Sequence, residues 1–109
     1  MKVVKSADLP WSEIAHELVG SDFGLGVTLL FVAAEPGRGP RLHKHPYAEV
    51  FIIQEGRATF TTGDEQVELG PGSVLIVEPE EPHAFVNTGS ETLRQIDIHL
   101  SADFSTEWL

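Results

Sequence analysis

The chain contains no cysteine. Disulfide bonds, thiolate metal ligands and a cysteine nucleophile are therefore excluded, and any metal site has to be built from histidine and carboxylate side chains. Basic residues are also scarce, because 7 Lys and Arg stand against 17 Asp and Glu and give a formal net charge of −10. A chain with so few cations cannot neutralise a run of phosphates, so we expect neither nucleic acid nor an anionic membrane as a partner.

Long apolar runs are absent as well. No segment approaches the roughly 20 apolar residues that cross a bilayer, and the N-terminus lacks the positive end and apolar core of a signal peptide. We therefore expect a cytoplasmic protein. A length of 109 residues, of which 41% are hydrophobic, suits a single domain over residues 1–109, with its core barrel over about 25–100.

Short apolar segments separated by Gly, Pro and Asp run along most of the chain. We predict strands over residues 2–5, 25–34, 48–54, 57–62, 65–69, 73–78, 83–88 and 92–100. Short strands at regular spacing favour an all-β antiparallel sandwich or barrel.

Two segments fall outside this pattern. Between Pro10 and Leu18 the apolar spacing predicts a short helical turn, which Asp8 or Ser12 can cap. The last residues form a tail that we expect to pack through Phe104 and Trp108. The predicted barrel is thus preceded by a short helical or irregular segment.

Four residues predict a metal site: His43, His45, Glu49 and His83. Strand side chains alternate with period two, so a His-x-His pair on an extended segment presents both imidazoles on one face, and Glu49 shares their parity. Three imidazoles and one carboxylate suit iron, manganese, nickel, copper or zinc better than calcium or magnesium. We predict one divalent transition metal per chain, of unresolved identity.

The glycines around the first three of these residues make the pattern specific. The segment begins at Gly37, continues through His43, His45 and Glu49, and ends at Gly56. A second segment runs from Gly72 to Asn87, after a short spacer over residues 57–71. The two segments resemble the first and second motifs of the cupin family. This resemblance implies an all-β, double-stranded β-helix, which is the jelly-roll barrel of that family.

The second segment departs from the usual cupin pattern in the turn before the histidine. Cupins usually carry Asp after the leading glycine, then Pro and Gly in that turn. This chain has other residues there: Ser73, Glu78 and Glu80. The spacing to His83 and Asn87 is kept, so the histidine retains its place, whereas the conformation of the turn over residues 78–81 stays open.

Parity along the strands also predicts the rest of the pocket. Its expected lining residues are Phe51, Ile53, Phe85 and Asn87. Tyr47 and His99 are the candidate catalytic residues, because the Tyr47 hydroxyl can reach a bound substrate and His99 lies on the last strand beside Asp97. The direction in which His99 points stays open, and we favour a structural role, or a role in supporting a metal ligand, over direct metal ligation.

The predicted site allows two kinds of function. We expect an enzyme acting on a small organic molecule, with dioxygenase chemistry at a redox-active metal or isomerase, cyclase or lyase chemistry at zinc. The alternative is a non-catalytic protein that senses or binds a small ligand or metal through the same pocket. A metal-free reading of sugar-epimerase type is weaker, since it leaves the four ligand residues without a purpose.

Within two of the predicted strands, residues 50–53 and 74–77 are apolar at both odd and even positions, so both faces of these segments are apolar. One face fills the barrel, while the other needs a cover, either the N-terminal segment or a second subunit. Cupins are commonly dimers, and the resemblance therefore favours a homodimer.

Overall fold

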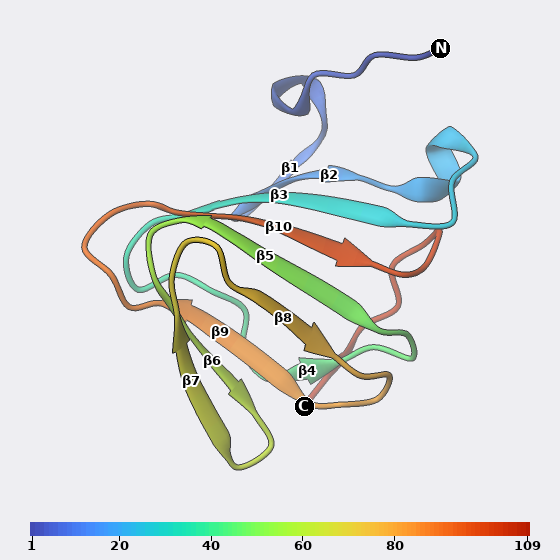
Figure 1. Cartoon of the computed structure of the whole chain (residues 1–109). Helices are drawn as coiled ribbons and strands as arrows, with labels where there is room; N and C mark the ends of the chain where they lie inside the picture. The colour runs from blue at the N-terminus through green and yellow to red at the C-terminus, as the bar shows by residue number, and fades with distance from the viewer.

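Two antiparallel β-sheets face each other in the computed structural model, which describes residues 1–109 (Figure 1). The larger sheet has the spatial order β1 (Trp11–Ser12), β2 (Ala15–Leu18), β3 (Thr28–Ala34), β10 (Leu93–His99), β5 (Glu49–Glu55) and β8 (Val74–Val77). The smaller sheet has the order β11 (Glu107–Trp108), β4 (His43–Lys44), β9 (His83–Asn87), β6 (Ala58–Thr62) and β7 (Glu65–Leu69). From β4 to β10 the chain passes repeatedly from one sheet to the other. This winding confirms the predicted all-β jelly-roll fold.

The space between the sheets is filled by alternate residues of the strands. Burial alternates along β5 and β9, so Phe51 and Phe85 point inward, and Phe60 of β6 joins them. The Phe60 ring centroid lies 5.0 Å from that of Phe51 and 5.2 Å from that of Phe85. Burying a side chain of this kind stabilises the fold by roughly 1.5–3 kcal/mol. This aromatic core lies next to the histidines described in the next section.

Each strand predicted from residue 25 onward overlaps a strand of the structure, but the prediction is wrong for the N-terminal region. Residues 2–5 form no strand, and the segment from Pro10 to Leu18 forms the hairpin of β1 and β2 instead of a helical turn. In this hairpin Ala15 pairs with Val32 on β3. An isolated helical turn is costly to nucleate, whereas pairing along β3 satisfies the backbone of both strands. The helical segments are limited to the 3₁₀ turns η1 (Ser6–Asp8) and η2 (Gly20–Phe23).

Two of the motif glycines occupy turns that require a left-handed backbone. Gly56, between β5 and β6, has φ of 83°, and Gly72, before β8, has φ of 89°. A Cβ atom on Gly56 would lie 2.8 Å from the Thr92 carbonyl oxygen. These conformations and contacts explain why the cupin-like pattern places glycine at these positions.

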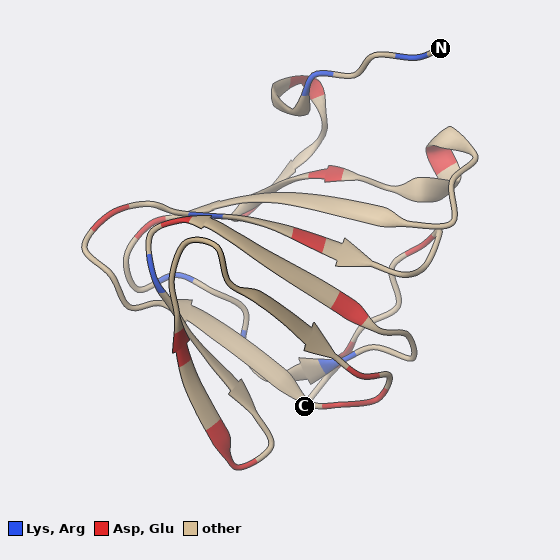
Figure 2. Ribbon diagram, viewed as in Figure 1, with Lys and Arg blue, Asp and Glu red and all other residues tan.

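The outer face of the larger sheet is apolar across four strands. Cross-strand pairing aligns Leu29, Ile98, Val50 and Ile76 in one row and Phe31, Ile96, Ile52 and Val74 in a second row. We call these eight residues the apolar rows. Val74 and Ile76, at the β8 edge, are 60% and 62% exposed. The acidic side chains lie elsewhere, notably along β7 and in the loop after β8 (Figure 2).

None of the helical segments has the length or apolar character that a membrane crossing requires.

Candidate metal centre

Two cross-strand pairs bring the predicted ligands together from opposite sheets. His43 of β4 lies opposite His83 of β9, and Glu49 of β5 lies opposite His99 of β10. His45 directly follows β4. One ligand atom from each of His43, His45, Glu49 and His83 lies within 4.8 Å of the others, and none of these residues is more than 6% exposed. The four residues predicted from the sequence therefore form one buried cluster between the sheets.

Backbone carbonyls fix the orientation of the three imidazoles. His43 Nδ1 lies 2.7 Å from the Arg41 oxygen, and His45 Nδ1 lies 2.9 Å from the Ser105 oxygen. His83 Nδ1 lies 2.9 Å from the oxygen of Glu81. A carbonyl oxygen only accepts, so each Nδ1 carries the proton and donates it. The three Nε2 atoms are then left as lone-pair donors for a metal, in the arrangement that a metal-bound histidine ordinarily has.

The donor set fits a transition metal. Nε2 of His45 is buried and has no hydrogen-bond partner, although it lies 3.2 Å from Glu49 Oε1. Nε2 of His83 lies 3.2 Å from the same oxygen. Lone pairs of neutral imidazoles beside a carboxylate oxygen repel one another unless a cation lies between them. These residues would hold a divalent transition metal through three nitrogens and one oxygen.

The protonation of the cluster without metal follows from its burial and hydrogen bonds. Burial lowers the pKa of His43 to about 4. Burial also opposes charge on His83, but hydrogen bonds to the Glu49 carboxylate and the Glu81 carbonyl outweigh it and raise the pKa of His83. For Glu49, burial is outweighed by hydrogen bonds from the histidines around it, and its pKa is lowered. The cluster thus keeps Glu49 ionised and available as a ligand.

The turn before His83 keeps its shape despite its unusual sequence. The Glu81 N–H donates to the Glu78 oxygen, Pro79 follows Glu78, and Glu80 has φ of 67°. Proline at the second position and a left-handed residue at the third are the features of a type II turn, in which glycine is favoured third. The Glu80 N–H donates to the His45 oxygen at 2.7 Å, which ties the turn to the first motif. Glu80 therefore occupies the place where cupins usually carry glycine.

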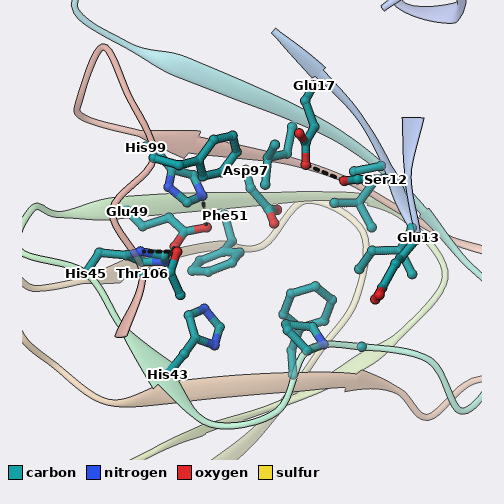
Figure 3. Close-up of a pocket in the computed structure, with 18 of the residues that line it drawn as sticks. Ser12, Glu13, Glu17, His43, His45, Glu49, Phe51, Asp97, His99 and Thr106 are labelled. Atoms are coloured by element: carbon teal, nitrogen blue, oxygen red, sulfur yellow. Dashed lines mark hydrogen bonds and ion pairs between the residues drawn. The ribbon is translucent and has the colours of Figure 1, made fainter. Parts of the chain in front are cut away.

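A cavity of about 490 Å³ adjoins the cluster (Figure 3). His43, His45 and Glu49 line one end, and Phe51 and Phe85, two of the four predicted lining residues, form part of its wall. The other two predicted lining residues do not reach it. Ile53 is buried in the core, and Asn87 is held in a turn, where its side chain donates to the Ala34 and Glu91 oxygens and accepts from Gly89.

The two candidate catalytic residues lie next to each other. His99 lines the cavity and points at the cluster, with its Nε2 3.1 Å from Glu49 Oε2 (Figure 3). The Tyr47 hydroxyl lies 2.7 Å from His99 Nδ1, and Tyr47 is not among the residues that line the cavity. The orientation left open by the sequence is thus inward for His99.

Three further parts of the cavity wall were not predicted from the sequence. Asp97 is buried in its wall, and its side chain bonds only to the Gln95 amide, at 2.8 Å. Burial, and after it the charge of Glu49, raises the pKa of Asp97 well above its ordinary value. The signal was present in the sequence, because Gln95 and Asp97 share the parity of His99 and place polar groups on an inward face.

The other two contributions come from the ends of the chain. The β1–β2 hairpin brings Ser12, Glu13 and Glu17 to the cavity (Figure 3). The C-terminal segment adds Phe104, Thr106 and Trp108. Phe104 and Trp108 pack as the sequence predicted: their ring centroids lie 5.0 Å from that of His99 and 5.1 Å from that of His43.

Known proteins resemble this chain in both sequence and fold. An uncharacterized protein of Methanocaldococcus jannaschii is 35% identical over 84 residues, which are 74% of this chain and 67% of that protein. A cupin-like protein of Thermotoga maritima has the same fold, with a TM-score of 0.78 at 21% identity, over 100% of this chain and 89% of that one. Oxalate decarboxylase of Bacillus subtilis gives a TM-score of 0.84 at 19% identity, over 97% of this chain but 31% of its own.

The sequence profile of the cupin domain family matches residues 30–99. This match includes all four residues of the buried cluster, the seven strands β4 to β10, and all of β3 except its first two residues. The chain therefore belongs to the cupin domain family.

Proposed function

We propose that this protein is a metal-dependent enzyme that converts a small organic molecule, with dioxygenase or isomerase and cyclase chemistry. The observation that supports this proposal most is the position of the His43, His45, Glu49 and His83 cluster at one end of an open cavity. A purely structural metal site is closed by its ligands, whereas a catalytic site keeps access for substrate. A bound divalent metal would supply Lewis-acid or redox chemistry there.

The cavity wall suits an organic substrate with an apolar body. Its volume of about 490 Å³ falls in the range of pockets for small-molecule ligands, roughly 300–1,000 Å³. Phe51 and Phe85 offer flat apolar surfaces beside the cluster, and Leu30 and Val32 extend the wall. Buried walls of this kind orient a substrate and exclude water from the reacting end. A dicarboxylate as small as oxalate would leave this part of the cavity unused.

The experiment is a turnover assay on protein loaded separately with Fe(II), Mn(II) and Zn(II). A panel of dicarbonyl, catechol and enol compounds is incubated in air, and products and oxygen uptake are followed, with His45→Ala as the control. Turnover by the loaded protein and none by His45→Ala would support the enzyme. Tight binding of panel compounds without any turnover would instead support a non-catalytic binding protein, and a protein that takes up none of the three metals would refute the metal-dependent enzyme.

We also propose that two copies of the chain associate through the apolar rows. These rows cover β3, β10, β5 and β8 without interruption, and Val74 and Ile76 are largely exposed at one edge. A contiguous apolar patch of this extent is unusual on a monomer, because its hydration is unfavourable. A second copy presents the same patch, so a two-fold pairing covers both patches at once.

A further inference from the structure

His99 contacts the carboxylate of the cluster rather than joining its converging nitrogens. Glu49 presents Oε1 to His45 and His83, each with Nε2 at 3.2 Å. Its second oxygen, Oε2, lies 3.1 Å from His99 Nε2. All of these side chains are almost completely buried. The two carboxylate oxygens of Glu49 thus face different partners.

The hydrogen bonds around Tyr47 determine where the His99 proton lies. The Ser105 N–H lies 3.3 Å from the Tyr47 oxygen, which accepts that bond. The Tyr47 O–H can then point to Nδ1 of His45, at 3.4 Å, or to Nδ1 of His99, at 2.7 Å. The first is excluded, because His45 Nδ1 already carries a proton for the Ser105 oxygen. Tyr47 therefore donates to His99 Nδ1.

A neutral imidazole has one protonated nitrogen and one free nitrogen. Since Nδ1 of His99 accepts from Tyr47, its proton is on Nε2 and points to Glu49 Oε2. Burial raises the pKa of Tyr47, which agrees with a hydroxyl that keeps its proton. Every donor in this chain, from Ser105 through Tyr47 and His99 to Glu49, meets one acceptor.

We infer that His99 is the positioning residue of the metal centre: its Nε2–H holds Glu49 Oε2, so that Oε1 alone is presented to the metal, while Tyr47 and Ser105 fix the His99 ring. This inference deepens the proposed function and rests on it. It assigns His99 and Tyr47 to the carboxylate ligand and not to the substrate. The Phe104 ring, 5.0 Å from the His99 ring, packs against the same imidazole from the C-terminal segment.

The absence of this hydrogen bond has a measurable consequence for metal binding. Without His99, Glu49 Oε2 loses its donor and the carboxylate is free to rotate or to offer both oxygens. Loss of a residue that orients a ligand typically weakens metal binding by about 10- to 100-fold, whereas loss of a ligand removes far more. The coordination of the ion changes as well, since Glu49 is no longer restricted to one oxygen.

The test is a titration of metal-free protein with Co(II) alone, whose visible absorption reports the number and type of its donors. We expect His99→Ala to bind one ion about 10- to 100-fold more weakly than wild type and with an altered spectrum. His99→Gln, whose amide N–H can replace Nε2–H, should recover most of the affinity and the wild-type spectrum. Tyr47→Phe should weaken binding less than His99→Ala does, because the His99 ring remains.

Each other outcome overturns the inference in a distinct way. If His99→Ala and His99→Gln both abolish binding as His45→Ala does, while thermal melts show them folded, His99 is itself a ligand. If all three variants keep wild-type affinity and spectrum, His99 does not position Glu49. If wild type binds no Co(II), the proposed metal centre fails, and the inference fails with it.

Discussion

The two faces of β10, a central strand of the larger sheet, have exchanged the composition that a strand of a β-sandwich usually shows. Toward the interior, β10 presents Gln95, Asp97 and His99, all buried. Toward the outside, the same strand presents Ile96 and Ile98. Polar side chains at inward positions cost desolvation free energy when they are buried. Apolar side chains at outward positions leave apolar surface in contact with water. Neither cost arises in a sheet that serves only to enclose a core.

This difference supports the two proposals made above: the inner face binds a metal and a substrate, and the outer face contacts a second subunit. The inner face gathers groups that are useful only if a cation and a substrate occupy the space before them. The outer face gathers groups that are stabilised only if another surface covers them. The neighbouring strands keep the ordinary arrangement, since Phe51 of β5, which pairs with Asp97, is buried and apolar. The exchange is thus confined to the strand that faces the proposed metal and substrate site on one side and carries part of the apolar rows on the other.

The largest effect is expected when a ligand is removed from the inner face. We predict that purified wild-type protein carries about one transition-metal ion per chain and that His45→Ala or His83→Ala abolishes it, since the remaining donors no longer enclose the ion. Elemental analysis measures the content. His16→Ala, which changes a histidine outside the cluster, should keep the metal. Unchanged metal in both cluster variants would contradict the site.

On the outer face, a charge should separate the two copies. We predict that Ile76→Lys converts a dimer into a monomer, because burying an unpaired ammonium in an apolar interface is unfavourable. Light scattering after size-exclusion chromatography measures the mass. Val67→Lys is the matched control, since Val67 is an exposed apolar residue on β7 of the other sheet. Metal content should be unaffected by both changes, and a wild-type monomer would refute the pairing.

A smaller effect should follow when the buried acid of the inner face is neutralised. The folded-state pKa of Asp97 is raised by burial, so the folded protein binds this proton more tightly than the unfolded chain. The free energy of unfolding therefore falls as pH rises above the unfolded pKa of about 3.9 and through the folded pKa. We predict that Asp97→Asn lacks this loss.

Urea denaturation of the metal-free protein checks the sign. Asp97→Asn should be more stable than wild type near pH 7, and the difference should shrink as pH falls below the unfolded pKa of about 3.9, where both chains carry a neutral side chain in the two states. A difference that does not change with pH would show that Asp97 does not titrate as its burial implies.

The smallest effect concerns the turn that delivers His83 to the inner face. Glu80 holds a left-handed backbone, which costs a non-glycine residue about 1–2 kcal/mol. Its carboxylate forms an exposed ion pair with Lys44 Nζ, at 3.0 Å, and solvent screening leaves such a pair with little effect on stability. Glu80→Gly loses the pair and adds freedom to the unfolded chain, so we predict a change in unfolding free energy within about 1 kcal/mol and unchanged metal content. Loss of metal in this variant would show that Glu80 does more than shape the turn.

Much of the inner face could be predicted from the chain. Alternation along an extended segment is a local property and correctly places His43 and His45 on one face. Glu49 reaches them for another reason, because it lies on β5 of the opposite sheet and not on the same strand. The same alternation in β10 could have identified Asp97. The helical spacing from Pro10 to Leu18 was misleading, because the open edge of β3 decided that segment and a local pattern does not contain its partner.

The sequence by itself determined the residue types available for a site, the excluded thiolate chemistry, the jelly-roll class and the four residues that form the buried cluster. The tertiary structure alone decided which partners these residues meet. Pairing of β5 with β10 placed His99 opposite Glu49, and the C-terminal segment brought the Ser105 oxygen to His45 across 60 residues of chain. Contacts between residues so far apart depend on which distant strands pair with each other, and no local propensity encodes that pairing.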